Sequence, residues 1–179
     1  MKIPGKFIFL AGALMALGVG WAGFPRAIYK SRTQPVDFSH KAHADKAGTK
    51  CDDCHALRAD GSFAGVPALD KCAGCHAAPM GNTAAEKQFI EKYVTPQREP
   101  EWLVYARQPE NVYFSHAAHV KRGNLKCERC HGDQGGSATL RPHQQDRVSG
   151  YSRGLQSMDD CIACHREQHR ENSCLDCHK

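Results

Sequence analysis

The chain has 179 residues, of which 41% are hydrophobic and 24% charged, a balance that neither a disordered tail nor a polytopic membrane protein shows. Its formal net charge is +5, but the basic residues form no block, so nucleic acid is not an expected partner. The unusual feature is the presence of ten cysteines and eleven histidines in one short chain.

Residues 1–30 differ in character from the rest of the chain. An uncharged run, 7–24, follows Lys6 and ends at Pro25. As a helix, this run spans about 27 Å, which is close to the thickness of the hydrocarbon core of a bilayer. A cleaved signal peptide is the alternative, but its cleavage site is weak because the apolar character continues through Trp21. We therefore expect an uncleaved membrane anchor.

Residues 31–82 form the first of two cysteine-bearing units. It holds a Phe-Ser-His-x-x-His run at 38–43 and two Cys-x-x-Cys-His motifs at 51–55 and 72–76. Two thiols at this spacing reach the two vinyl groups of one haem, and the next imidazole becomes the proximal iron ligand. The unit is thus predicted to bind two haem c groups. Their thioether residues are Cys51, Cys54, Cys72 and Cys75, and their proximal ligands are His55 and His76.

Residues 83–112 link the two units and carry the one clear helical periodicity of the outer chain. Thr83 and Glu86 form a capping-box signature that opens a helix over 84–94, which Pro96 ends. An extended connector with several apolar residues follows. Its composition fits either a strap packed over the haems or a docking surface for another subunit.

Residues 113–179 form a second unit that repeats the first and extends it. Its Phe-Ser-His-x-x-His run at 114–119 and its motif at 127–131 lie 76 positions after their counterparts. Two further motifs follow, and three more haem c groups are expected. Their thioether residues are Cys127, Cys130, Cys161, Cys164, Cys174 and Cys177, and their proximal ligands are His131, His165 and His178.

The five motifs leave no cysteine over, and the composition of the chain would give about 0.03 of them by chance. Zinc sites draw their other ligands from a distant second pair, and a disulfide framework needs no histidine at a fixed offset. A redox dithiol needs only one motif. The sequence therefore predicts five covalently bound haem c groups.

Six histidines lie outside the motifs, whereas five distal ligands are needed if two imidazoles hold every iron. These six candidates are His40, His43, His116, His119, His143 and His169. Met80, five residues after Cys75, fits either an axial thioether or a packing residue.

With about 30 residues available per haem outside the anchor, the chain cannot build an ordinary apolar core. The haems take the place of that core. We therefore expect loops and short α-helices wrapped around the haems, little or no β-structure, and no folding of the outer region without haem.

These motifs resemble the class III multihaem cytochromes, in particular their small triheme members, over 114–179 and in part over 38–80. In that family, the first histidine of each pair ligates the haem of the motif that follows, and the second ligates the next haem. The implied distal–proximal pairs are His40–His55, His43–His76, His116–His131, His119–His165 and His143–His178. His143 lies farther from Cys161 than the family pattern suggests, so His143 and His169 compete for the last haem. His169 is otherwise a surface residue or a ligand to a sixth, non-covalent haem.

The anchor, the five motifs and the connector at 101–116 together resemble the multihaem cytochrome subunit of the alternative complex III and periplasmic menaquinone reductase group. The resemblance implies a complex with an iron–sulfur or molybdopterin-like periplasmic subunit and polytopic membrane subunits. It also implies electron exchange with a soluble periplasmic cytochrome c. We expect an electron-transfer subunit with no catalytic residue, because an iron held by two imidazoles has no open position.

The expected location is the bacterial inner membrane, because haem attachment to such motifs takes place on its outer side. The anchor, through residues 7–24, leaves the haem units in the periplasm. The alternative function is a small anchored multihaem quinol dehydrogenase that acts on its own. Such proteins typically carry Met directly after the first motif, where this chain has Ala56. A multihaem reductase needs an open iron, which the surplus of histidines disfavours.

Overall fold

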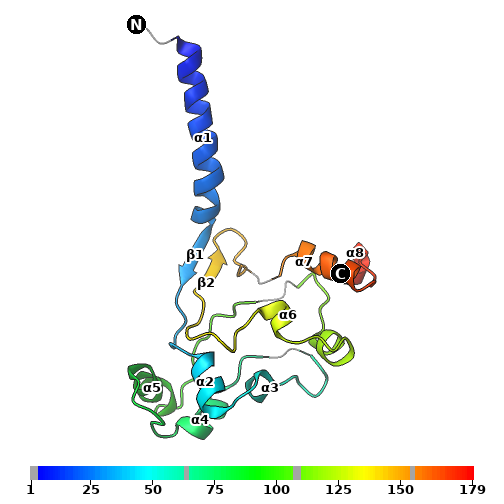
Figure 1. The fold of residues 1–179 in the computed structure, drawn as a ribbon. Helices are drawn as coiled ribbons and strands as arrows, with labels where there is room; N and C mark the ends of the chain where they lie inside the picture. The colour runs from blue at the N-terminus through cyan, green and yellow to red at the C-terminus, as the bar shows by residue number, and fades with distance from the viewer. Residues whose placement is uncertain (1–3, 63–64, 107–109, 154–155) are drawn as a thin grey trace.

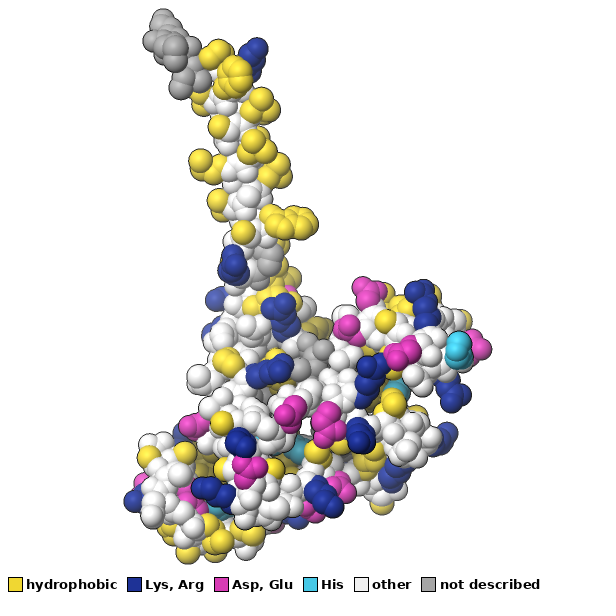
Figure 2. Space-filling view, viewed as in Figure 1, with side chains coloured by type: hydrophobic (Ala, Val, Ile, Leu, Met, Phe, Trp, Pro, Cys, Tyr) yellow, Lys and Arg dark blue, Asp and Glu magenta, His cyan; other side chains and the backbone are white. Residues whose placement is uncertain are grey.

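The computed structural model describes residues 4–62, 65–106, 110–153 and 156–179, and it shows one long helix standing on an elongated body (Figure 1). Helix α1 covers Gly5–Ile28. Its segment Gly5–Phe24 has a mean hydropathy of 2.0, and none of it is buried against the body. Figure 2 shows apolar side chains along the visible face of this helix and mixed charges on the body below. The helix is long and apolar enough to span a membrane, a test that a signal sequence also passes.

The body consists of short helices and loops. In chain order the helices are α2 (His40–Ala47), α3 (Cys51–Cys54), α4 (Leu69–His76), α5 (Ala84–Phe89), α6 (Glu128–His131), α7 (Met158–Glu167) and α8 (Cys174–Cys177). Two π-helical segments accompany them, η1 (Ile90–Val94) and η2 (Ala117–Arg122). Each Cys-x-x-Cys-His motif coincides with one short helix, namely α3, α4, α6, α7 or α8, so a single helical turn brings the two cysteines together.

One small antiparallel sheet joins α1 to the second unit. Strand β1 (Tyr29–Arg32) follows α1 directly and pairs with β2 (His143–Asp146), with Arg32 opposite His143. The expected architecture, with mostly short helices and loops and little β-structure, is confirmed.

The helix predicted over 84–94 is present as α5 followed by η1, and Pro96 lies just beyond its end. The capping box forms only in part. The Thr83 hydroxyl accepts the backbone N–H of Glu86 at 3.2 Å, as predicted. The Glu86 carboxylate does not return to Thr83, because it accepts other donors that are described below.

The apolar core of the described residues is small and lies where α4, α5 and η1 meet. Its buried side chains are Leu69, Phe89, Tyr93 and Val94. Cys72 of the second motif packs against them, so this core backs one haem site. The scarcity of buried apolar side chains is consistent with a fold organised around haems.

The connector after η1 lies against the segment that follows the anchor. The Gln34 side chain accepts the N–H of Leu103 at 3.0 Å and donates to its carbonyl at 2.8 Å. Trp102 and Leu103 are half-buried, which favours the strap over the docking surface. Residues 107–109 of the connector lie outside the described residues.

Candidate haem sites

The repeated Phe-Ser-His-x-x-His runs fold in the same way in both units. In the first, the Ser39 hydroxyl caps α2 by accepting the N–H of Ala42 at 3.1 Å. The Ser39 carbonyl accepts the Nδ1–H of His43 at 2.8 Å. The Phe38 ring stacks on His43 with centroids 4.4 Å apart and meets His40 edge-on at 4.9 Å. One serine and one phenylalanine therefore orient both histidines.

In the second unit, Ser115 and Phe114 repeat these contacts. The Ser115 carbonyl accepts the Nδ1–H of His119 at 2.8 Å. The Phe114 ring lies 4.7 Å from the ring of His119 and 4.8 Å from that of His116. The sequence repeat thus corresponds to a repeated local structure.

Four of the implied distal–proximal histidine pairs lie opposite one another, with interplanar angles between 6° and 62°. The ring centroids lie 6.4 Å apart for His40 and His55, 6.0 Å for His43 and His76, 6.4 Å for His116 and His131, and 6.1 Å for His119 and His165. A first-row metal–imidazole bond is about 2.0 Å long, so two rings on opposite sides of one metal ion have centroids roughly 6 Å apart. The spacing therefore fits one iron between each pair.

The hydrogen bonds of these rings fix which nitrogen faces the partner. The backbone carbonyls of Gly65 and Glu171 accept from Nδ1 of His55 and His165 at 2.8 and 2.6 Å. A carbonyl can only accept, so Nδ1 carries the proton and Nε2 keeps the lone pair that a metal requires. Burial, followed by the neighbouring histidines, lowers the pKa of His40 and His116, which also favours neutral rings.

His76 has a different partner. Its Nδ1 lies 2.9 Å from Oε1 of Glu86, on α5. The N–H groups of Met80 and Gly81 also donate to this carboxylate, at 2.6 and 2.8 Å. The N–H of Met80 is the main cause that lowers the pKa of Glu86, so the side chain is held as a carboxylate.

Cysteines of different motifs meet, and these contacts give the order of the motifs in space. Desolvation is the main cause that raises the pKa of the Cys51 thiol, and its hydrogen-bond contact with Cys127 raises that pKa further. Burial likewise raises the pKa of the Cys72 thiol, and Cys54 raises it further. Desolvation raises the pKa of the Cys161 thiol, and Cys130 and Cys177, which belong to two other motifs, raise it further.

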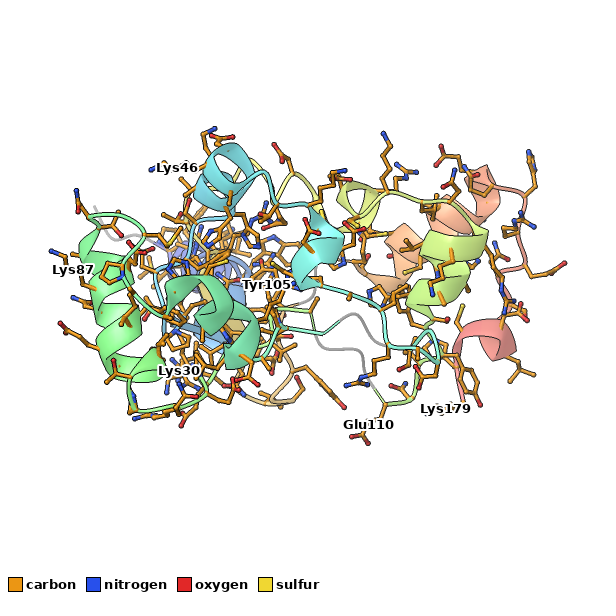
Figure 3. The ribbon with its side chains drawn as sticks, turned by 90° about the horizontal axis from the view of Figure 1, so that it is seen from below. Lys30, Lys46, Lys87, Tyr105, Glu110 and Lys179 are labelled. Carbon is orange, nitrogen blue, oxygen red and sulfur yellow. The ribbon has the colours of Figure 1, made fainter. Side chains whose placement is uncertain are left out.

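The spatial order is therefore 72–76, 51–55, 127–131, 161–165 and 174–178, which differs from the order along the chain. The views agree with this row: α4 and α5 lie at one end, α3 and α6 between, and α7 and α8 at the other end (Figures 1 and 3). Lys87 and Lys179 mark the two ends in Figure 3.

The remaining candidates are not brought into such pairs among the described residues. His143 is buried on β2, and its Nδ1 has no hydrogen-bond partner. Figure 1 shows β2 beneath α1, whereas α8, which precedes His178, lies at the far side of the body. His169 is exposed, with a φ of 50°. The ligand of the last haem and the presence of a sixth haem stay predictions. Met80, the candidate for an axial thioether, has a side chain that is 73% exposed.

The donor set fits haem better than zinc. The ten cysteines are free thiols, two per motif, each pair followed by a histidine. Within the ranges that the structure describes, no three His, Cys, Asp or Glu side chains converge as a zinc site requires. Opposed imidazoles with adjacent thiols are the arrangement that a covalently bound iron porphyrin needs.

Comparison with known proteins agrees with this geometry. The family described as Class III cytochrome C matches residues 23–100, and the family of Cytochrome c7 and related cytochrome c matches residues 112–179. The protein named "Menaquinone reductase, multiheme cytochrome c subunit" from Nitratidesulfovibrio vulgaris strain Hildenborough is 39% identical over 186 residues. The alignment covers 96% of this chain and 89% of that protein. The chain belongs to the class III multihaem cytochrome c family.

The resemblances drawn from the sequence, to class III cytochromes and to the menaquinone reductase cytochrome subunits, are thereby confirmed. Cytochromes c bind haem covalently, so this cytochrome carries haem c. The two family matches leave residues 101–111 of the connector between them.

Sequence reasoning missed the roles of Phe38, Phe114 and Glu86. The two phenylalanines recur at the same place in both repeats, a signal that pointed to a shared structural role. In the sequence, Glu86 indicated only a helix cap. Its contact with His76 could not be predicted, because that contact depends on how α5 folds back on α4.

Proposed function

We propose that this cytochrome is a membrane-anchored, periplasmic pentahaem protein of the bacterial inner membrane. It relays electrons between a soluble periplasmic redox partner and a quinone-reactive respiratory complex. The observation that carries the proposal is the row of five motifs, in which four pairs of imidazoles lie opposite each other with ring centroids 6.0–6.4 Å apart.

The proposed distal ligands are His40, His43, His116 and His119, with His143 or His169 for the last haem. Two imidazoles per iron leave no position for substrate, so the haems supply one-electron transfer only. The chain holds the rings, fixes their tautomers through Nδ1, and sets the spacing of neighbouring sites. We assign no catalytic residue to it.

The relay runs along the spatial order of the motifs, from 72–76 at one end to 174–178 at the other. In Figure 1, α4 lies at the end of the body farthest from α1, whereas α8 lies at the level of β1. With α1 retained as the anchor, one end of the row faces the periplasm and the other lies nearer the membrane surface. Each end is then a port for a different partner.

The partners follow from the similar protein, which its name describes as a subunit of menaquinone reductase. We propose that this chain also assembles with further subunits, namely an iron–sulfur or molybdopterin-like periplasmic subunit and a polytopic membrane subunit. A soluble periplasmic cytochrome c would then exchange electrons with the outer port. The proposal that α1 is retained as the anchor is supported by its connection to the body: α1 continues into β1, which pairs with β2 of the second unit.

The test is to obstruct the middle of the row without removing a haem. His116→Met replaces one imidazole by a thioether, which raises the potential of that iron and makes the middle site a trap. In membranes, electron transfer between a reduced soluble cytochrome c and menaquinone should fall strongly at unchanged haem content. Arg122→Met, which places Met at an exposed position at the end of the π-helical segment that follows His116, is the matched control and should transfer electrons as the wild type does.

Undiminished transfer in His116→Met would contradict the relay. Gentle purification from the membrane then separates the two functions considered: co-eluting subunits support the complex, and a solitary protein that oxidises quinol supports the small quinol dehydrogenase.

A further inference from the structure

The proximal histidines differ in what accepts their Nδ1–H. For three of them the acceptor is a neutral backbone carbonyl. These pairs are His55 with Gly65 at 2.8 Å, His165 with Glu171 at 2.6 Å, and His178 with Asn111 at 3.3 Å. His76 instead meets the Glu86 carboxylate at 2.9 Å.

Glu86 is held firmly in this position. Its Oε1 also accepts the N–H of Met80, and its Oε2 accepts the N–H of Gly81. The backbone N–H of Glu86 itself is bonded to the hydroxyl of Thr83, which fixes the start of α5. The side chains of Glu86 and His76 are 10% and 23% exposed, so little water screens the contact. The Phe89 ring, one turn later, lies edge-on to the His76 ring, with the two centroids 6.0 Å apart.

A carboxylate acceptor changes the ligand that it touches. It draws the Nδ1–H toward itself and makes the imidazole a stronger electron donor, which stabilises Fe(III) relative to Fe(II). We propose that Glu86 is a positioning residue that lowers the reduction potential of the haem held by Cys72, Cys75 and His76. This inference rests on the proposed function, because it requires haem at this motif.

The place of this haem gives the effect a consequence. It stands at one end of the row, next to a single neighbouring motif, 51–55. A lowered potential at the end shifts electrons toward the interior of the row. Glu86 therefore keeps the terminal haem oxidised until a partner donates to it.

The test is Glu86→Gln in the full, haem-loaded cytochrome, followed by a potentiometric titration monitored by EPR. Each step adds one electron from a mediator to one iron, Fe(III) to Fe(II). One of the five steps should move to higher potential by at least a tenfold change in its equilibrium constant, about 59 mV for one electron. Its low-spin EPR signal should shift as well, since the imidazole loses anionic character. The other four steps should stay in place.

Asp160→Asn is the matched control. Its carboxylate lies directly before Cys161 and accepts the N–H and the hydroxyl of Ser157, at 2.8 and 2.7 Å, without touching an axial histidine. It should leave all five steps unmoved. If Glu86→Gln folds poorly, Glu86→Asp keeps the charge but withdraws it from His76, and the same step should move by a smaller amount in the same direction.

Unmoved steps in both Glu86 variants would overturn the inference and leave Glu86 as a cap for Met80 and Gly81. Wild-type protein without bis-imidazole haem steps would instead contradict the proposed function, so the two failures are distinguishable.

Discussion

At the residue scale, a six-residue run orients the two histidines that we propose as axial ligands of two different haems. Ser39 starts the helix with its hydroxyl and fixes the His43 ring with its carbonyl, and Phe38 packs against both histidines. The same contacts recur at Ser115 and Phe114. Because every bond involved is local, this part of the site is encoded in a short stretch of sequence.

His119→Ala tests the ligand assignment. His119 faces His165 at 6.1 Å, and its loss should remove one bis-imidazole low-spin signal. The haem should stay attached, because its thioether bonds to Cys161 and Cys164 do not depend on the distal ligand. EPR gives the low-spin count and intact mass gives the haem count.

The neighbouring exposed lysine provides the control for this variant. Lys121→Ala lies on the same π-helical segment and should leave both counts unchanged. An unchanged low-spin count in His119→Ala would contradict the assignment.

At the element scale, the contact of α4 with α5 and η1 is the best-packed part of the body. Leu69 is 3% exposed there, and Leu69→Ala should lower the free energy of unfolding of the haem-loaded protein by about 2–5 kcal/mol. Denaturant unfolding monitored at the haem absorption band measures the loss. Val148→Ala, at a position that is 89% exposed, should change stability by less than about 0.5 kcal/mol. Equal effects of both variants would show that the haems alone determine stability.

The two haem units meet closely at Gly61. Its φ is 74°, and a Cβ at this position would lie 2.9 Å from the Cβ of Ala117 in the second unit. Gly61→Ala should therefore cost about 1–3 kcal/mol, from backbone strain and from the contact. Gly48→Ala has a similar φ of 66° but meets no atom within 4 Å, so it isolates the cost of strain.

The comparison is made by thermal unfolding of both haem-loaded variants. A larger loss in Gly61→Ala than in Gly48→Ala supports close packing of the two units, and equal losses would contradict it.

At the scale of the whole molecule, contacts between motifs arrange the sites in a single row. Cys51 lies beside Cys127, and β1 pairs with β2, so the two units form one continuous body beneath α1. The row begins at the second motif of the chain and ends at the fifth. In the proposed relay, electrons would enter and leave at opposite ends of this row, as a protein that connects two partners requires.

How much the sequence could predict depends on the range of the contacts. The haem motifs and the helix over 84–94 follow from local spacing, and the sequence predicted both. The meeting of His76 with Glu86, the order of the motifs and the position of His143 on β2 depend on how distant segments pack. No local signal encodes such contacts, and all five implied histidine pairs came from likeness to a family rather than from spacing alone.

The proposed relay requires that ten cysteines hold five haems on one retained chain. Intact-mass measurement of the protein purified from its native membrane tests it most directly. The mass should equal that of the 179-residue chain plus five haem groups. A mass equal to the bare chain, or to the chain with zinc, would contradict the relay.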